Sequence, residues 1–263
     1  MSIKLMLKKY IPLKFLKKIK NIFVVFGIWE NVSGQYRLIN SPNKIILKQT
    51  YNDVWKDSAL PGQQLKITDE QLKSRDDVAH VSALIRAIKN TEIAVPHILE
   101  VGCSTGYHGE FFKKAGISLE YEGCDYSEAF IFEAKKRYPE RTFCVCDATQ
   151  LPYPEKKFQI VISGCCILHI IDYEQAIKES ARVAKDFVIF HRTPVLHQQQ
   201  TSFFEKKGYG KKMIEIFFNE KELFELFYKY GLLVQSVETL ESFEVNKLNE
   251  PVFVKEYVCK KML

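Results

Sequence analysis

The stretch that decides the fold runs from His97 to Asp125 and reads HILEVGCSTGYHGEFFKKAGISLEYEGCD. A short apolar run ends in a turn containing Gly102 and Gly106, a helix-like segment follows, and a second apolar run ends at Asp125. This pattern predicts a strand–turn–helix–strand unit with a carboxylate at the tip of its second strand. Asp125 lies 19 positions after Gly106, close to the spacing at which an acidic residue holds a ribose.

The turn distinguishes two kinds of nucleoside-binding unit. A dinucleotide fold carries G-x-G-x-x-G, whose glycines shape a pyrophosphate site at a helix start. Here Gly102, Ser104 and Gly106 occupy alternate positions, and Glu100 precedes the first glycine. A carboxylate at that point would repel a pyrophosphate, whereas it suits a cationic ligand or a water network around an ammonium group. The turn therefore favours a ligand other than a dinucleotide.

The segment E-V-G-C-S-T-G resembles motif I of the class I S-adenosylmethionine-dependent methyltransferases, E/D-x-G-x-G-x-G, with Ser104 in place of the middle glycine. Four further matches to motifs of that family follow in family order. They are Gly123-Cys124-Asp125-Tyr126-Ser127, Asp147-Ala148, Leu151–Pro154 followed by Phe158–Val161, and Ile167–Asp172. Gln159 stands where the family has an aspartate. Because five motifs occur in order between about residues 96 and 192, the resemblance is specific.

The resemblance implies S-adenosylmethionine as the cofactor and assigns residues to it. Asp125 is expected to hold the ribose hydroxyls, and Asp147 to meet the adenine amino group. The residues expected to bind the cofactor are Glu100, Gly102, Cys103, Ser104, Gly106, Asp125, Tyr126, Asp147, Ala148 and Ser163.

Strands alternate with helices along most of the chain, which predicts an α/β fold. The expected architecture is a doubly wound, mainly parallel, seven-stranded Rossmann-like sheet with an antiparallel C-terminal hairpin. Strands are predicted at 97–102, 119–125, 142–146, 158–163, 187–190, 232–239 and 252–258. Thr68-x-x-Gln71 and Asn219-x-x-Glu222 predict helix N-caps, the first for a helix reaching about residue 90.

The chain divides into three predicted segments. They are a basic amphipathic tail at 1–29, an N-terminal cap segment at 30–67, and an S-adenosylmethionine-binding methyltransferase domain at 68–263. Within the cap segment, residues 34–38 and 44–48 are expected to pair as a hairpin across Asn40-Ser41-Pro42-Asn43. The polar and aromatic run from 191 to 216 matches no regular core element.

The net charge of +6 is concentrated in the tail. Residues 1–29 contain seven lysines and no acidic residue, and the other 31 basic and 32 acidic residues give the body a charge of −1. The body therefore lacks the charge of a nucleic-acid-binding surface. The tail suits peripheral contact with an anionic membrane. A helix packed on the protein itself, a partner-binding helix and a solvated tail are the alternatives.

The seven cysteines do not predict a metal site, because Cys144-x-Cys146 and Cys165-Cys166 lack zinc-ligand spacing. They are typical of small apolar residues in a reduced cytosolic protein. No run of 18 apolar residues exists, so no membrane-spanning helix is expected. We expect a cytoplasmic protein, with the inner face of the membrane as the place of any contact made by the tail.

His169 and His191 are the candidate catalytic residues. Each lies at or just beyond the carboxyl end of a predicted strand, where open parallel sheets place their reactive groups. A neutral histidine can remove the proton of an acceptor hydroxyl. A structural hydrogen bond is an equally weighted role for His169. Arg192 could hold an acidic acceptor or a phosphate, and His108 is expected to orient the turn.

The leading interpretation is a methyltransferase acting on a small-molecule or glycan-like acceptor hydroxyl, with a lipid-linked acceptor suggested by the tail. An RNA methyltransferase is one alternative, and the charge of the body argues against it. The other alternative is a non-catalytic nucleotide-fold protein that recruits partners at a membrane.

Overall fold

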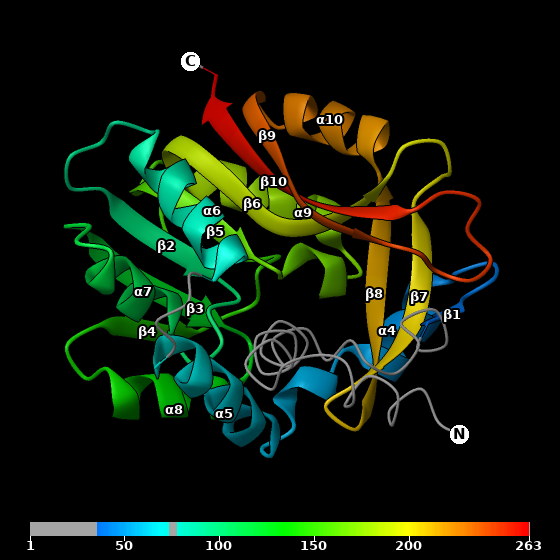
Figure 1. Ribbon diagram of the computed structural model, residues 1–263, viewed down its shortest axis with the longest axis horizontal. Coiled ribbons are helices and arrows are strands. Elements are labelled where there is room, and N and C mark those ends of the chain that lie inside the picture. The colour runs from blue at the N-terminus through cyan, green and yellow to red at the C-terminus, as the bar shows by residue number, and fades with distance from the viewer. Residues whose placement is uncertain (1–35, 74–77, 263) are drawn as a thin grey trace, which may run out of the picture.

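The computed structural model describes residues 36–73 and 78–262 and shows a twisted sheet with helices on both faces (Figure 1). The strands are β1 (Tyr36–Leu38), β2 (His97–Val101), β3 (Glu120–Asp125), β4 (Thr142–Val145), β5 (Phe158–Gly164), β6 (Ala184–Leu196), β7 (Ser202–Gly208), β8 (Lys211–Asn219), β9 (Leu232–Phe243) and β10 (Val252–Lys261). The helices are α4 (Lys44–Tyr51), α5 (Leu60–Lys73), α6 (Ala79–Lys89), α7 (His108–Lys114), α8 (Glu128–Arg137), α9 (Tyr173–Val183) and α10 (Glu220–Lys229), with 3-10 turns η1 (Val54–Lys56) and η2 (Ile167–His169).

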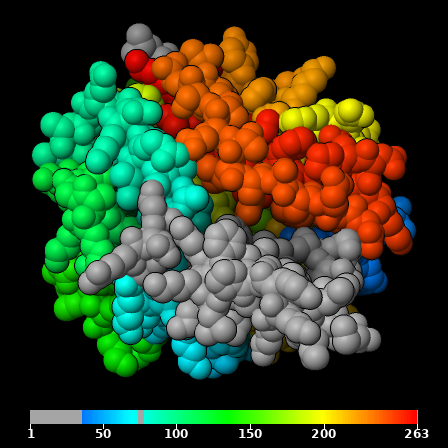
Figure 2. Space-filling model, viewed as in Figure 1, coloured from blue at the N-terminus to red at the C-terminus, as the bar shows by residue number. Residues whose placement is uncertain are grey.

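Seven strands form the central sheet in the order β4-β3-β2-β5-β6-β10-β9. The first five are mutually parallel, and β10 is antiparallel to both β6 and β9. This arrangement confirms the predicted Rossmann-like sheet with its antiparallel C-terminal hairpin. The edge strand β9 is largely exposed, and its region occupies the upper part of the face drawn in Figure 2.

The central strands are apolar on both faces because helices cover both. Ile98 faces a cluster that includes Leu84 of α6 and Phe112 of α7, whereas Leu99 faces a cluster that includes Ile177 of α9 and Phe227 of α10. Strands buried on both sides lose the alternation of polar and apolar residues. The continuous apolar runs in the sequence therefore mark the centre of a doubly wound sheet.

The run from 191 to 216 is regular structure, contrary to expectation. Strand β6 continues to Leu196, the antiparallel pair β7–β8 follows, and β8 joins the end of β6 in parallel. β1 adds to the outer side of β7. This three-stranded extension has its own apolar cluster, in which the rings of Phe204 and Phe217 lie 4.6 Å apart. Strands β7 and β8 lie beyond residue 192, outside the stretch in which the sequence matches motifs of the methyltransferase family.

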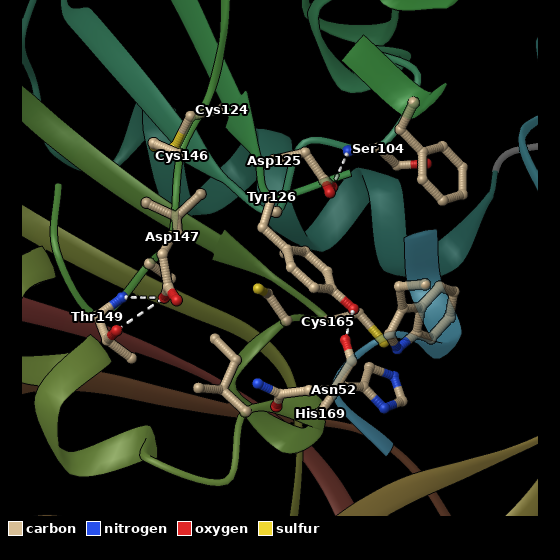
Figure 3. A pocket seen from close by; sticks show the side chains of 18 of the residues that line it. Asn52, Ser104, Cys124, Asp125, Tyr126, Cys146, Asp147, Thr149, Cys165 and His169 are labelled. Carbon is tan, nitrogen blue, oxygen red and sulfur yellow. Dashed lines mark hydrogen bonds between the residues drawn. The ribbon is translucent and has the colours of Figure 1, made fainter. Parts of the chain in front are cut away.

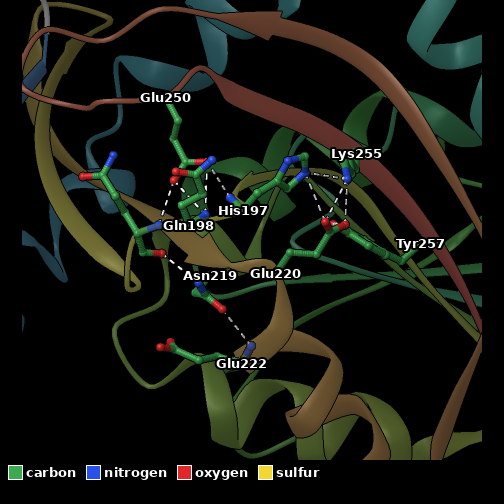
Figure 4. A network of polar contacts seen from close by, with 9 residues as sticks. His197, Gln198, Asn219, Glu220, Glu222, Glu250, Lys255 and Tyr257 are labelled. Carbon is green, nitrogen blue, oxygen red and sulfur yellow. Dashed lines mark hydrogen bonds and ion pairs between the residues drawn. The ribbon is translucent and has the colours of Figure 1, made fainter.

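A polar network joins the extension to the central sheet (Figure 4). The Glu250 carboxylate accepts hydrogen bonds from the backbone N–H groups of His197, Gln198 and Gln199 in the β6–β7 connection. Glu220, at the start of α10, accepts hydrogen bonds from Lys255 and Tyr257 of β10. Glu250 thus satisfies three successive backbone N–H groups of this loop, groups that would be costly to leave without a partner.

The expected hairpin at 34–48 is wrong. Residues 44–51 form helix α4, and β1 pairs with β7 instead. The side chain of Asn43 accepts hydrogen bonds from the backbone N–H groups of Ile45 and Ile46, which makes Asn43 an N-cap. Asparagine and proline favour both turns and helix starts, so the motif alone could not separate the two.

The helix expected to begin at Thr68 also differs. Thr68 lies inside α5, which begins at Leu60, and its hydroxyl donates to the carbonyl oxygen of Gln64 at 3.1 Å. Such back-bonding lets a threonine occupy a helix interior. The cap expected at Asn219 is confirmed, because its side chain accepts from the backbone N–H of Glu222.

The predicted tail at 1–29 lies outside the described residues. Within 36–73 and 78–262, no helix has the length and apolarity needed to cross a membrane.

Phe217 provides a test of the extension. Phe217→Ala should destabilise the protein by about 3–5 kcal/mol, because the side chain is fully buried between two aromatic rings. Phe132→Ala is the matched control, since Phe132 is 64% exposed on α8. Denaturant unfolding of both variants measures the difference. Equal stabilities of the two variants would show that the extension is not packed as described.

Candidate functional site

A pocket opens at the carboxyl ends of β2, β3, β4 and β5 (Figure 3). Its walls come from these strand ends, from α4 and η1 on one side, and from the β7–β8 turn. Of the residues expected to bind a cofactor, those that line it are Gly102, Ser104, Asp125, Tyr126, Asp147 and Ala148. Those expected but placed outside the lining are Glu100, Cys103, Gly106 and Ser163.

The turn after β2 depends on left-handed backbone. Gly102 and Gly106 have φ angles of 71° and 72°, and a Cβ on Gly106 would lie 2.5 Å from the Phe143 ring. Ser104, between them, also has a positive φ, of 52°. Glycine reaches this conformation without steric cost, whereas serine does not. The serine is therefore held by its contacts.

Asp125 supplies the contact that holds Ser104. One carboxylate oxygen accepts from the backbone N–H of Ser104 at 3.0 Å, and the other accepts from that of Ser127 at 3.0 Å. Burial raises the pKa of Asp125 to about 6, although the backbone donors oppose the rise. The side chain lines the pocket, so each oxygen can also meet a ligand hydroxyl.

Asp147 and Tyr126 complete this end of the pocket. The Asp147 carboxylate accepts from the backbone N–H of Thr149 at 2.8 Å and from its hydroxyl at 2.7 Å. The Tyr126 hydroxyl donates to the carbonyl oxygen of Asn52 at 2.7 Å, which ties the N-terminal cap to the β3 tip. The carboxylates of Asp125 and Asp147 therefore stand at the tips of neighbouring strands, where a nucleoside would lie across them.

Comparisons with known proteins give a match to the part of the chain that contains Asp125 and Asp147. A family model described as a methyltransferase domain covers residues 99–190. A probable S-adenosylmethionine-dependent methyltransferase of Mycolicibacterium smegmatis is 29% identical over 93 residues, which are 35% of this chain and 35% of that protein. Residues 99–190 therefore match a methyltransferase domain, and over this region the chain is similar to members of the S-adenosylmethionine-dependent methyltransferase family. S-adenosylmethionine is the cofactor of this family.

Other methyltransferases share the same region or the same fold. A demethylmenaquinone methyltransferase of Renibacterium salmoninarum is 31% identical over 94 residues, which are 35% of this chain and 39% of that protein. The matched region thus spans little more than a third of the length of either curated relative. A solved S-adenosylmethionine-dependent methyltransferase from Methanosarcina mazei has a TM-score of 0.54 and 17% identity, covering 67% of this chain and 97% of that one. At that identity the likeness shows the fold alone.

Glu100, the acidic residue of the methyltransferase motif I, is buried behind the turn. One carboxylate oxygen lies 2.6 Å from Nδ1 of His108, and the other accepts a hydrogen bond from the Tyr121 hydroxyl. With 1% of its surface exposed, the side chain has no access to the pocket. Through these two partners Glu100 supports the turn from the core side. His108 is therefore linked to the turn by its bond to Glu100.

His169 lies in the pocket wall at the end of η2. Its Nδ1 is 2.7 Å from the carbonyl oxygen of Ile214, so Nδ1 carries the proton and donates it. The neutral ring then has its lone pair on Nε2. The indole ring of Trp55 packs against the imidazole with ring centroids 4.9 Å apart. His169 can therefore form this structural hydrogen bond through Nδ1 and still present a lone pair on Nε2.

His191 does not face the pocket, which corrects the expectation from the sequence. The ring is 1% exposed, and its Nδ1 lies 2.7 Å from a carboxyl oxygen of Glu256 on β10. Burial lowers the pKa of His191 well below its ordinary value, and the neighbouring His108 and His80 lower it further. His191 lies at the end of a predicted strand, and the sequence alone does not show that this end is buried beside Glu256 of β10.

Several pocket residues lie outside the motifs of the methyltransferase family. They are Lys48, Tyr51, Asn52, Trp55, Gln64, Tyr107, Phe130, Cys146, Thr149, Gly164, Cys165, Cys166, Arg192 and Tyr209. The aromatic residues Tyr51 and Trp55 carried an ambiguous signal, since large aromatics before the fold serve equally well for packing. Tyr209 gave none, because the β7–β8 turn that presents it was not foreseen.

Glu256 generates a prediction on stability. Burial raises its pKa to about 8 from 4.5, with the nearby Glu238 adding to the rise and Arg86 opposing it. Between these pH values the unfolded chain binds fewer protons than the folded one, so stability should fall as pH rises. Glu256→Gln keeps a donor for His191 and removes this dependence.

We therefore expect Glu256→Gln to stabilise the protein by on the order of 1–3 kcal/mol near pH 8, with little effect near pH 5. Denaturant unfolding at both pH values measures it. Glu225→Gln, at a side chain 67% exposed on α10, is the control. A variant that is less stable than the parent protein at pH 8 would mean that Glu256 is ionised and paired with a protonated His191.

Proposed function

We propose that the protein transfers the methyl group of S-adenosylmethionine to a hydroxyl of a small-molecule acceptor. The observation that carries the proposal is that Asp125 and His169 line one continuous pocket. A ligand that places its ribose on Asp125 would extend toward a base that can take the acceptor's proton. The carboxyl edge of an open parallel sheet is where such a pair is expected.

The cofactor end of the pocket follows from the strand tips. Asp125 would bind the two ribose hydroxyls, and Asp147 with Ala148 would meet the adenine. The left-handed turn at Gly102 and Ser104 brings backbone close to the ligand. Glu100 would act at a distance, because it supports the turn through His108 and Tyr121 instead of touching the cofactor.

Methyl transfer mainly requires the protein to align the acceptor oxygen with the methyl group and the sulfur. The acceptor oxygen attacks the sulfonium methyl, so an O–C bond forms while the S–C bond breaks and its electron pair returns to sulfur. The pocket must hold oxygen, methyl and sulfur in line at near-attack distance. The proton of the hydroxyl goes to Nε2 of His169, whose lone pair is fixed by the hydrogen bond from Nδ1 to Ile214.

The demethylmenaquinone methyltransferase among the relatives supports a small molecule as acceptor. A glycan-like or lipid-linked hydroxyl is a second form of the same proposal, motivated by the basic tail. Full-length protein incubated with methyl-labelled S-adenosylmethionine and a fractionated cell extract would separate the classes. We expect label in the small-molecule or lipid fraction. Label confined to RNA, or none in any fraction, would contradict the proposal.

Asp125 tests the cofactor assignment. Asp125→Ala should weaken S-adenosylmethionine binding by roughly 1.5–3 kcal/mol, the range for hydrogen bonds to a charged group. Calorimetric titration measures the change. Glu128→Ala is the matched control, because Glu128 carries the same charge three positions later on the exposed side of α8. An Asp125→Ala variant that binds the cofactor as tightly as the parent protein would refute the ribose assignment.

His169 tests the base. His169→Gln should lower turnover by roughly 10²- to 10⁴-fold while cofactor affinity stays constant. His97→Gln is the control, since His97 bonds to Glu122 away from the pocket. If turnover and thermal stability fall together in His169→Gln, His169 is only a structural tie.

A further inference from the structure

Arg192 stands at the carboxyl end of the β6 segment that pairs with β5, beside the pocket. Its neighbour across the sheet is Cys165, and the Cys165 N–H donates to the carbonyl oxygen of His191 at 2.9 Å. Both Cys165 and Arg192 adopt left-handed backbone, with φ angles of 59° and 56°. Non-glycine residues in this region cost energy and cluster at functional sites.

The partner strand explains how Arg192 is turned inward. The register of β10 against β6 shifts between Lys255 and Tyr257, opposite the stretch that contains Arg192. A bulge of this kind redirects the neighbouring side chain and often occurs next to a site. The guanidinium consequently lines the pocket instead of joining the exposed surface of the sheet.

The hydrogen-bond donors of Arg192 are unused within the described part of the chain. Its one ion pair there is with Glu241, at 4.0 Å, which is too long for a hydrogen bond. A guanidinium carries five N–H donors in a fork that matches a carboxylate or phosphate. The side chain is 31% exposed and lines the pocket, so these donors are accessible to a ligand.

The pocket's own carboxylates do not compensate this charge. Asp125 and Asp147 accept hydrogen bonds at the cofactor end, and Asp172 forms an ion pair with Lys48. Burial would raise the pKa of the Cys165 thiol, yet the nearby Arg192 and His169 lower this pKa below its ordinary value. Among the described residues, Glu241 at 4.0 Å is the ion-pair partner of Arg192, so an anionic ligand could take up the unused N–H donors.

The rest of the acceptor end is aromatic. Trp55 packs between His169 and Tyr209, with ring centroids 4.9 Å and 6.0 Å away. The Tyr209 hydroxyl donates to Oε1 of Gln64 at 2.6 Å, which fixes the ring in the wall. Flat apolar walls of this kind favour a planar or unsaturated body.

We infer that Arg192 binds a carboxylate or phosphate of the acceptor, whose flat apolar body lies against Trp55 and Tyr209. The inference rests on the proposed function and narrows it: the substrate class is an anionic small molecule that presents a hydroxyl to His169. Arg192 is then a residue of substrate specificity, and the cofactor does not need it.

Small probes test this assignment on full-length protein saturated with S-adenosylhomocysteine. Benzoate, phenyl phosphate and the neutral benzyl alcohol share one ring and differ in charge. By ligand-observed NMR titration, at least one anion should bind at least about tenfold more tightly than benzyl alcohol, because it gains a charge-assisted bidentate contact. Whichever anion binds more tightly identifies the source as carboxylate or phosphate.

Variants of Arg192 test whether this residue causes the preference for the anionic probe. Arg192→Gln should reduce the preference for the anion to less than about twofold, and Arg192→Lys should retain part of it, because lysine keeps the charge but not the fork. Lys212→Gln is the control, since Lys212 is a cation 62% exposed outside the pocket lining. The affinity for S-adenosylhomocysteine should stay constant in all three.

Two outcomes would overturn the inference. Equal binding of the anions and benzyl alcohol by the parent protein excludes an anion site, whatever the folding of the variants. Weaker binding of S-adenosylhomocysteine by Arg192→Gln would instead assign the guanidinium to the carboxylate of the cofactor. A parent protein that binds no S-adenosylhomocysteine contradicts the proposed function, and the probe titrations without it then still test Arg192 alone.

Discussion

The Asp125 carboxylate is the contact on which the site depends. It receives one backbone N–H from the turn after β2 and one from the start of α8, so a single buried charge fixes two segments at once. Burying a carboxylate is costly unless hydrogen bonds compensate it. Here the compensation is partial, and the pKa of Asp125 remains raised to about 6. In the proposed function, two ribose hydroxyls would supply the remaining hydrogen bonds.

A second buried group, Glu100, supports the same turn from behind. Its bonds to His108 and Tyr121 connect α7 and β3 beneath the glycines. The cofactor half of the pocket is thus braced by two carboxylates, one facing the ligand and one facing the core. This half lies within residues 99–190, the region matched by the methyltransferase family model.

The acceptor half is built largely from other parts of the chain. Trp55 comes from η1, Tyr209 from the β7–β8 turn, and Arg192 from β6 just beyond the matched region. These segments include the three-stranded extension, which adds to a sheet that the family otherwise shares. Loops and additions on a constant scaffold commonly carry specificity. In the proposed function, the acceptor would therefore contact residues outside the region that the family model matches.

Six of the ten residues that the sequence assigned to the cofactor line the pocket, because they lie close together in the chain and their spacing follows from strand and turn geometry. The other four, Glu100, Cys103, Gly106 and Ser163, lie outside the lining. The prediction failed where contacts are remote. Asn43 has the same local chemistry in a turn and in an N-cap, and only the pairing of β1 with β7 separates them. His191 looked accessible because β10, which covers it, lies some 60 residues later. For Arg192 the sequence already suggested contact with an acidic acceptor or a phosphate, but no local pattern shows the register shift between β6 and β10 opposite this residue.

The account rests on the identity of the ligand at Asp125, and a direct titration tests it. S-adenosylmethionine and NAD, each added to full-length protein in a calorimeter, would compete for the same strand tips. We expect S-adenosylmethionine to bind at one site per chain and to block any weaker binding of NAD. Preferential binding of NAD, or no binding of S-adenosylmethionine, would contradict the central claim.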